Sequence, residues 1–216
     1  MADDSNLPEQ TLKTTEEVAK TAQALLSFLE DTLGTVPGDL VGVLGGDWLH
    51  HYRLRNLNKL SEETRKILED RGVQPKDYDE VSPRLMRPLL QAASDESDTN
   101  LRGLWARLLA NAVDPNTGIS LRAEFMKTAI KLEPIDVIVV DHISEMRRTQ
   151  KKDALSKNDL FVALQNSGRI SRQSEFEVSL DHIGATGILN TSAGDPVITH
   201  FGHEFMRACD PDPTEE

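Results

Sequence analysis

The chain has 216 residues, of which 38% are hydrophobic, so it is long enough to bury a core and is not expected to be disordered throughout. Its formal net charge of −12 repels nucleic-acid phosphates and membrane surfaces at long range, which disfavours both as partners unless a local patch reverses the sign. The single cysteine, Cys209, excludes an intrachain disulfide, and we therefore expect a cytoplasmic protein.

The N-terminal third offers neither a leader nor a membrane span. The first ten residues, MADDSNLPEQ, lack the positive start and apolar core of a secretory signal, so we expect no export. The most apolar window, residues 36–49, is too short to cross a bilayer and contains Asp39 and Asp47. Its glycines each weaken a helix by about 1 kcal/mol relative to alanine. Because its polar face is acidic rather than basic, we expect this window to pack between helices rather than to act on membranes.

Apolar residues at helical spacing predict a series of amphipathic helices in the first two thirds of the chain. The first ends near Gly34, and the second runs from about residue 40 to residue 71, with Gly72 as its C-terminal glycine. The next helix is predicted to begin at Ser82 and Pro83. The serine side chain is expected to accept the free amides, and proline at the first helical position loses no hydrogen bond.

The strongest predicted helix follows Asp98, which is expected to cap it. We expect Trp105 and Leu108 in this helix to be buried against the helix that contains residues 85–90. Two further helices are predicted over residues 120–132 and 134–148. The β-branched run IDVIVVDHI in the last of these is also compatible with a strand, but Pro134 in its first turn favours a helix.

A polar, basic stretch at residues 150–158 predicts a linker. We therefore expect a helical domain over residues 12–149, a second domain over 159–209, and flexible acidic tails at 1–11 and 210–216.

The second domain is predicted to contain two helices, a hairpin and a last helix. The first helix covers residues 159–166, and a capping box of Ser174 with Glu177 opens the second, which ends at Gly184 and Gly187. The segments ILN and VIT flank the turn-prone TSAGDP and predict two strands, after which Thr199 caps the last helix. This order is typical of a winged-helix module. The predicted fold class is therefore mostly α, with a helical bundle followed by a small winged-helix-like α+β module.

No catalytic, metal-binding or cofactor-binding set is evident in the sequence. The adjacent His50 and His51 point to different helix faces, and the pair His200 and His203 lacks a fourth ligand and the H-E-x-x-H order of a zinc protease. Cys209 has no activating base nearby, and the string GVLGGD has no lysine for a phosphate loop. The carboxylates of Asp95, Glu96 and Asp98 are expected to complement a helix start. We therefore expect no enzymatic activity and no cofactor, the alternative being an enzyme whose residues are scattered along the chain.

The one basic and aromatic stretch of the chain is HHYRLRNLNK. It is a candidate interaction surface. The acidic Glu62 and Glu63 follow at once and dilute its field, so a solvated helix face is the plainer interpretation. The candidate residues are Trp48, His51, Tyr52, Arg53, Arg55 and Lys59.

A DNA-binding regulator or antitoxin-like protein is the main alternative to a protein-binding role. Its recognition helix would be residues 174–187, which carry Glu175, Glu177 and Asp181. Residues 151–216 contain six basic and eleven acidic side chains, a net charge of −5, whereas affinity for DNA grows with the number of phosphate contacts. We therefore expect this module to bind protein. The candidate nucleic-acid contacts would be Lys151, Lys152, Lys157, Arg169 and Arg172.

Residues 81–115, VSPRLMRPLLQAASDESDTNLRGLWARLLANAVDP, resemble the central signature of the abortive infection alpha (Abi-alpha) family. The resemblance extends to GGDWLHHYRLRNLNKLSEETRKILEDRG, FEVSLDHIGATGILN and VITHFGHEFMRACDP, and so covers about residues 12–209. It implies a bacterial protein linked to phage defence and mobile elements, and it carries over no active residues. We expect a defence protein that binds a protein partner or a second copy of itself. A DNA-binding regulator and a membrane-active effector are the alternatives.

Overall fold

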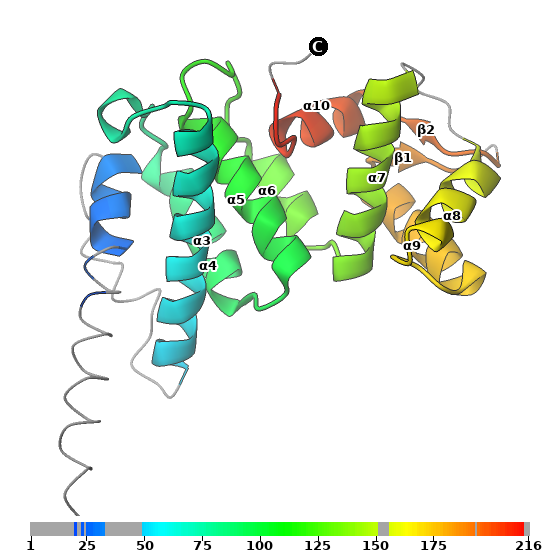
Figure 1. Cartoon of the computed structure of the whole chain (residues 1–216), viewed down its shortest axis with the longest axis horizontal. Helices are drawn as coiled ribbons and strands as arrows, with labels where there is room; N and C mark the ends of the chain where they lie inside the picture. The colour runs from blue at the N-terminus through cyan, green and yellow to red at the C-terminus, as the bar shows by residue number, and fades with distance from the viewer. Residues whose placement is uncertain are drawn as a thin grey trace, which may run out of the picture.

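A computed structural model describes residues 20, 23, 25–32, 49–150, 156–192 and 194–213. These residues are mostly helical and contain one two-stranded sheet. In Figure 1 the helices α3 to α6 lie on one side of the molecule, α7 to α9 and the hairpin lie on the other, and α10 lies between them. The elements are α3 (His50–Asp70), η1 (Pro75–Asp77), α4 (Pro83–Asp95), α5 (Thr99–Val113), α6 (Ala123–Ala129), α7 (Pro134–Gln150), α8 (Lys157–Asn166), α9 (Gln173–Ala185), β1 (Leu189–Asn190), β2 (Val197–Ile198) and α10 (His200–Ala208).

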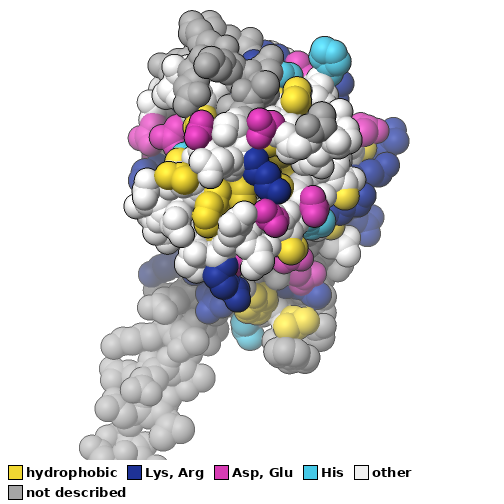
Figure 2. Space-filling model, turned by 90° about the vertical axis from the view of Figure 1, so that its right-hand side faces the viewer, with side chains coloured by type: hydrophobic (Ala, Val, Ile, Leu, Met, Phe, Trp, Pro, Cys, Tyr) yellow, Lys and Arg dark blue, Asp and Glu magenta, His cyan; other side chains and the backbone are white. Residues whose placement is uncertain are grey.

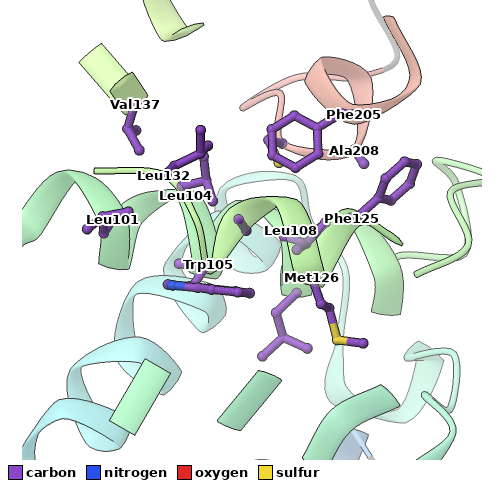
Figure 3. Packing of buried hydrophobic residues seen from close by; sticks show 14 of the residues in the cluster. Leu101, Leu104, Trp105, Leu108, Phe125, Met126, Leu132, Val137, Phe205 and Ala208 are labelled. Carbon is purple, nitrogen blue, oxygen red and sulfur yellow. The ribbon is translucent and has the colours of Figure 1, made fainter. Parts of the chain in front are cut away.

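Helix α5 is the central helix of the first half, as its apolar stripe predicted. The Asp98 side chain caps it by accepting hydrogen bonds from the backbone N–H groups of Asn100 and Leu101, at 2.8 and 3.2 Å. Trp105 and Leu108 are buried, and Figure 3 shows them among the core side chains. The main neighbour of α5 is α3 rather than the expected α4. The apolar stripe covers enough of α5 to serve both helices, and the pattern alone did not rank them.

Helix boundaries confirm some of the predicted end signals and correct others. Gly72 has φ of 74°, the left-handed conformation expected after a helix. Ser82 does stand at the N-cap of α4 with Pro83 inside the first turn, but its side chain makes no capping bond. Its backbone carbonyl instead accepts from the N–H groups of Leu85 and Met86. The expected side-chain cap at Ser82 was therefore wrong, because backbone groups already satisfy these amides.

The third quarter of the chain is helical, as predicted. The β-branched run after Pro134 lies in α7, so the helical interpretation is confirmed over the strand. The helix predicted at residues 120–132 is shorter, since α6 covers only Ala123–Ala129. It begins after Arg122, which is extended, and it ends in a turn before α7.

The C-terminal elements follow the predicted order of helix, helix, hairpin and helix. Strands β1 and β2 pair antiparallel, with Leu189 opposite Ile198, and the Thr199 hydroxyl accepts from the Gly202 N–H at 2.8 Å to cap α10. The predicted capping box of Ser174 was wrong. Helix α9 starts two residues earlier, with Arg172 as its N-cap and without a side-chain cap. Glu177 contacts Gln173 and Lys157 instead. Gly184 lies inside α9 rather than ending it.

The buried hydrophobic side chains form one continuous cluster, from Leu25 in the N-terminal helical residues to Cys209 after α10. The predicted division into domains at residues 150–158 stays a prediction, and residues 151–155 lie outside the described part of the chain. Residues 36–48, including Trp48, also lie outside it.

Gly202 determines how closely α10 approaches the hairpin. A Cβ atom at this position would overlap the backbone carbonyl oxygen of Ile188, which precedes β1. Backbone cannot move aside as the end of a flexible side chain can. Glycine therefore permits this close contact between α10 and the chain leading into β1.

Candidate functional site

The predicted interaction segment lies on α3, where it forms part of a mixed helix face. The Arg53 side chain is paired with Asp95 at 2.7 Å, and the Arg55 guanidinium lies 5.4 Å from the ring centroid of Tyr52. His51, Arg55 and Lys59 are exposed. The segment therefore offers only part of its basic charge to solvent, because Arg53 is neutralised within the fold.

The predicted nucleic-acid contacts do not form one stripe in the described part of the chain. Lys157 lies 3.4 Å from Glu177, and the exposed Arg172 lies 3.8 Å from Glu175. Arg169 lines a cavity against α7. Lys151 and Lys152 lie outside the described residues. The acidic residues of α9 thus lie beside two of the cations that a DNA-binding role requires.

The outward face of α9 is a mixed surface with one large apolar side chain, Val178, and one carboxylate, Asp181. Besides Gln173 in the first turn, its exposed positions are Ser174, Val178, Asp181 and Ala185, spaced at three or four residues, and Val178 is 69% exposed. Val162 on the neighbouring helix α8 is 42% exposed. Figure 2 shows hydrophobic side chains near the middle of this end of the molecule, with a Lys or Arg side chain directly beside them and acidic side chains around them. Such a face is suited to a protein partner better than to a phosphate backbone.

The histidines and the cysteine do not assemble a reactive centre among the described residues. No group of three or more His, Cys, Asp or Glu side chains there is placed to hold a metal ion. Cys209 is buried, and burial raises the pKa of its thiol to about 12, although Arg107 acts in the opposite direction. The thiol is therefore protonated at neutral pH and is not a nucleophile.

We expect the native protein to be inert toward a thiol reagent such as dithiobis-nitrobenzoate. The reagent needs a thiolate and access, and the fold denies Cys209 both. In denaturant, the single cysteine should release one thionitrobenzoate per chain. Reaction of the native protein at the rate of the denatured chain would contradict the burial of this side chain.

A buried aspartate joins the start of α7 to α9. One oxygen of Asp136 accepts from the hydroxyl of Ser179 at 2.6 Å, and the other lies 2.6 Å from Nδ1 of His182. The second oxygen also accepts from the backbone N–H of Glu133 at 2.8 Å. Serine, histidine and aspartate also make up the catalytic triad of many hydrolases, in which the serine hydroxyl donates to the imidazole. Here the Ser179 hydroxyl donates to Asp136 and not to the imidazole. The described groups therefore form a structural joint without an activated nucleophile.

The C-terminal residues after α10 are held by side chains of the first half of the chain. Asn111 donates to the backbone carbonyls of Ala208 and Asp210, both at 2.9 Å. Arg107 donates to the Cys209 carbonyl at 2.6 Å, and Arg71 donates to the Pro211 carbonyl at 2.7 Å. Four consecutive carbonyls are thus bound. A cavity of about 170 Å³ beside them is lined by Arg107, Arg148 and Arg169, among others.

Two titratable side chains near this cavity, Asp141 and His142, have shifted pKa values. Burial raises the pKa of Asp141, although its ion pair with Arg107 at 2.7 Å opposes this effect. Burial also lowers the pKa of His142 below its ordinary value of 6.5, and Arg169 adds to that effect while Glu145 opposes it. The Nε2 atom of His142 is buried without a hydrogen-bond partner among the described residues.

We expect His142 to make the protein less stable as the solution becomes mildly acidic. Because its folded pKa is depressed, the unfolded chain binds the proton more readily. The free energy of unfolding should therefore fall as the pH drops through the unfolded pKa near 6.5. Urea denaturation of the parent and of His142→Gln at about pH 7.5 and about pH 5.5 measures this, since the substitution should flatten the change. An identical pH dependence in both proteins would exclude this role.

An apolar hollow lies between α6 and α10. Phe125 forms its floor, the half-buried Phe201 forms a wall, and the cavity volume is about 390 Å³. The two rings lie 5.9 Å apart between centroids, and Phe205 stacks on Phe201 at 6.2 Å. The Arg122 guanidinium lies 5.8 Å from the Phe125 centroid. We refer to this hollow as the aromatic pocket. The exposed residues at its rim are Arg122, Glu124, His200 and Glu204.

Sequence reasoning missed both the aromatic pocket and the Asp136 joint. Phe125 and Phe201 are far apart along the chain, as are Asp136 and His182, and no periodic pattern pairs them. The predicted Thr199 cap placed the start of α10 correctly, and His200 at the pocket rim was considered in the sequence only as a metal ligand.

Comparison with known proteins gives one match. The family model described as abortive infection alpha matches residues 53–198, from the first turn of α3 to the end of β2. No curated protein and no solved structure matches the chain.

Proposed function

Because this chain belongs to the abortive infection alpha family, we propose that it serves in phage defence as a non-enzymatic protein that acts by binding another protein. The observation that carries this proposal is the surface chemistry of its C-terminal part. Of the basic side chains described there, Lys157 and the exposed Arg172 lie beside glutamates and the exposed Arg169 lines a surface cavity, while the outward face of α9 presents Val178 and Asp181.

The charge of the partner follows from this surface. The charges described on α9 itself are Glu175, Glu177 and Asp181, and a surface with exposed Val178 and these carboxylates is complemented by an apolar surface with lysine or arginine at its edge. A second copy of the chain is a weaker fit, since two copies at −12 repel each other. We therefore propose a different protein, with a basic and apolar face, as the partner.

We also propose that the C-terminal elements form a winged-helix-like module used for protein binding. The order α8, α9, hairpin and α10 supports this assignment, with the hairpin as the wing. DNA binding by the same module is the alternative. It is disfavoured because α9 would bring Glu175, Glu177 and Asp181 toward the phosphates.

A membrane-active role has less support. Within the described residues, no helix combines the length and apolar character that crossing a bilayer requires. We propose the cytoplasm as the place of action, where a buried free cysteine such as Cys209 is commonplace.

A phage challenge of bacteria that express the protein tests the proposal. We expect the parent to reduce the plating of at least one phage in a panel by tenfold or more, and we expect Val178→Glu to lose that protection. A charge in the middle of an apolar contact opposes binding, whereas on an exposed position it leaves folding intact. Ile130→Glu is the matched control, because Ile130 is 56% exposed at the end of α6, away from α9.

The outcomes separate the alternatives. Absence of protection by the parent against every phage would overturn the defence role. Protection that survives Val178→Glu, in a variant with parental circular dichroism, would overturn binding through α9. A shift of labelled duplex DNA that weakens with salt and is lost in Arg172→Glu would establish the DNA-binding alternative instead.

A further inference from the structure

We propose that the aromatic pocket is a second binding surface, separate from α9, which docks a peptide segment with an apolar anchor side chain next to lysine or arginine. The proposal goes beyond the role of α9 and does not depend on it.

The pocket has the size and lining of an anchor site. Its volume of about 390 Å³ falls at the lower end of the range for ligand pockets and accommodates one or two large apolar side chains. Three phenylalanine rings support it, since Phe125 and Phe205 also meet edge to face at 6.0 Å. Phe125 and Phe205 are both buried in this packing, so an incoming side chain meets an aromatic surface that the fold already forms. Preformed apolar pockets are where anchor residues of protein interfaces bind.

The rim carries carboxylates that no described cation neutralises. Glu124 on α6 and Glu204 on α10 are both exposed, and neither makes an ion pair with a described residue. Arg122 lies against the Phe125 ring, where the cation is attracted to the aromatic face. Arg122, Glu124 and Glu204 together give the rim a net charge of −1, which favours a cationic side chain beside the anchor.

The ends of this chain are poor occupants. Residues 1–20 carry five carboxylates against two lysines, and residues 210–216 carry only acidic charges. Both are repelled by Glu124 and Glu204, and a second copy of the whole chain brings a net charge of −12. Charge complementarity thus favours a basic segment of a different protein.

A selection from a displayed library of random 12-residue peptides tests the proposal. The full-length protein is the bait, and the double variant Glu124→Lys/Glu204→Lys is the counter-selection target. We expect enriched peptides to carry Trp, Phe or Leu with Lys or Arg within two positions of it. Both glutamates are exposed, so the double variant is expected to fold like the parent.

Fluorescence anisotropy of one enriched, labelled peptide then measures the site. We expect the dissociation constant to rise at least tenfold in Glu124→Lys/Glu204→Lys and in Phe201→Ser. It should stay within twofold in the matched control Glu69→Lys/Glu80→Lys, which reverses two exposed glutamates elsewhere. The control changes the net charge of the protein by the same amount as the pocket variant, so it accounts for the general attraction of a basic peptide to an acidic protein. Phe201→Ser is used only if its circular dichroism matches the parent.

Three results would overturn the proposal. They are an absence of enrichment over the counter-selection target, a consensus without basic residues, and binding that the matched control weakens as much as the pocket variant does. None of them bears on the phage challenge of Val178→Glu, so this proposal and the role of α9 fail independently.

Discussion

Trp105→Ala is expected to lower the free energy of unfolding by about 3 to 5 kcal/mol, the range for removing a large buried aromatic side chain. Trp105 is 2% exposed on α5, the helix that packs against α3, α4, α7 and α10. Its removal leaves a cavity among helices that are already fixed by their other contacts, so the site cannot collapse fully. Urea denaturation followed by circular dichroism measures the change.

Two further variants test whether the loss of stability comes from the buried ring of Trp105. Trp105→Phe retains a ring and should cost clearly less than the alanine variant, since less buried volume is lost. Asn100→Ala, at an exposed position of the same helix, should stay within about 0.5 kcal/mol of the parent. A loss below about 1 kcal/mol in Trp105→Ala would mean that α5 is not central to the core.

The second large effect is expected at Asp136, where alanine should cost about 3 kcal/mol or more, because each buried donor left without its acceptor costs about 1 to 3 kcal/mol. The carboxylate is 1% exposed and serves three groups, on Glu133, Ser179 and His182. Its loss leaves the Ser179 hydroxyl and the Glu133 amide without their acceptor, and it removes the bond that joins α7 to α9.

The loss of unfolding free energy distinguishes stabilisation by the Asp136 hydrogen bonds from stabilisation by packing alone. Asp136→Asn keeps the shape and one acceptor oxygen, so its cost should lie between those of the parent and the alanine variant. Asp181→Ala, on the exposed face of α9, is the matched control and should leave stability nearly unchanged. If Asp136→Asn and Asp136→Ala were equally and only slightly destabilised, the hydrogen bonds would not hold α9 against α7.

The positions of the helices were readable because their signals are local. Asp98 caps α5, Pro134 lies in the first turn of α7, and Thr199 caps α10, as expected from residues three or four positions away. The hairpin followed from β-branched residues on either side of a turn-prone segment. In each case the relevant interaction falls within one turn of the chain, so the pattern itself carries it.

Local signals failed where another group offered the same bond. The Ser82 side chain makes no capping bond, because the Ser82 carbonyl already accepts from the neighbouring backbone N–H groups. Glu177 bonds to Gln173 and Lys157 rather than completing a capping box with Ser174. The short motif states which bond a residue is able to make. Competing partners within reach decide which bond it does make.

By itself the sequence determined the mostly helical composition, the order of the elements and the acidic character that disfavours DNA. Only the tertiary structure decided which surfaces and joints those elements make. Phe125 meets Phe201 in the aromatic pocket, Asp136 meets His182 between α7 and α9, and Asn111 binds the carbonyls after α10. Each of these contacts joins residues more than forty positions apart, and helical periodicity specifies which face of a helix is apolar without specifying which partner covers it.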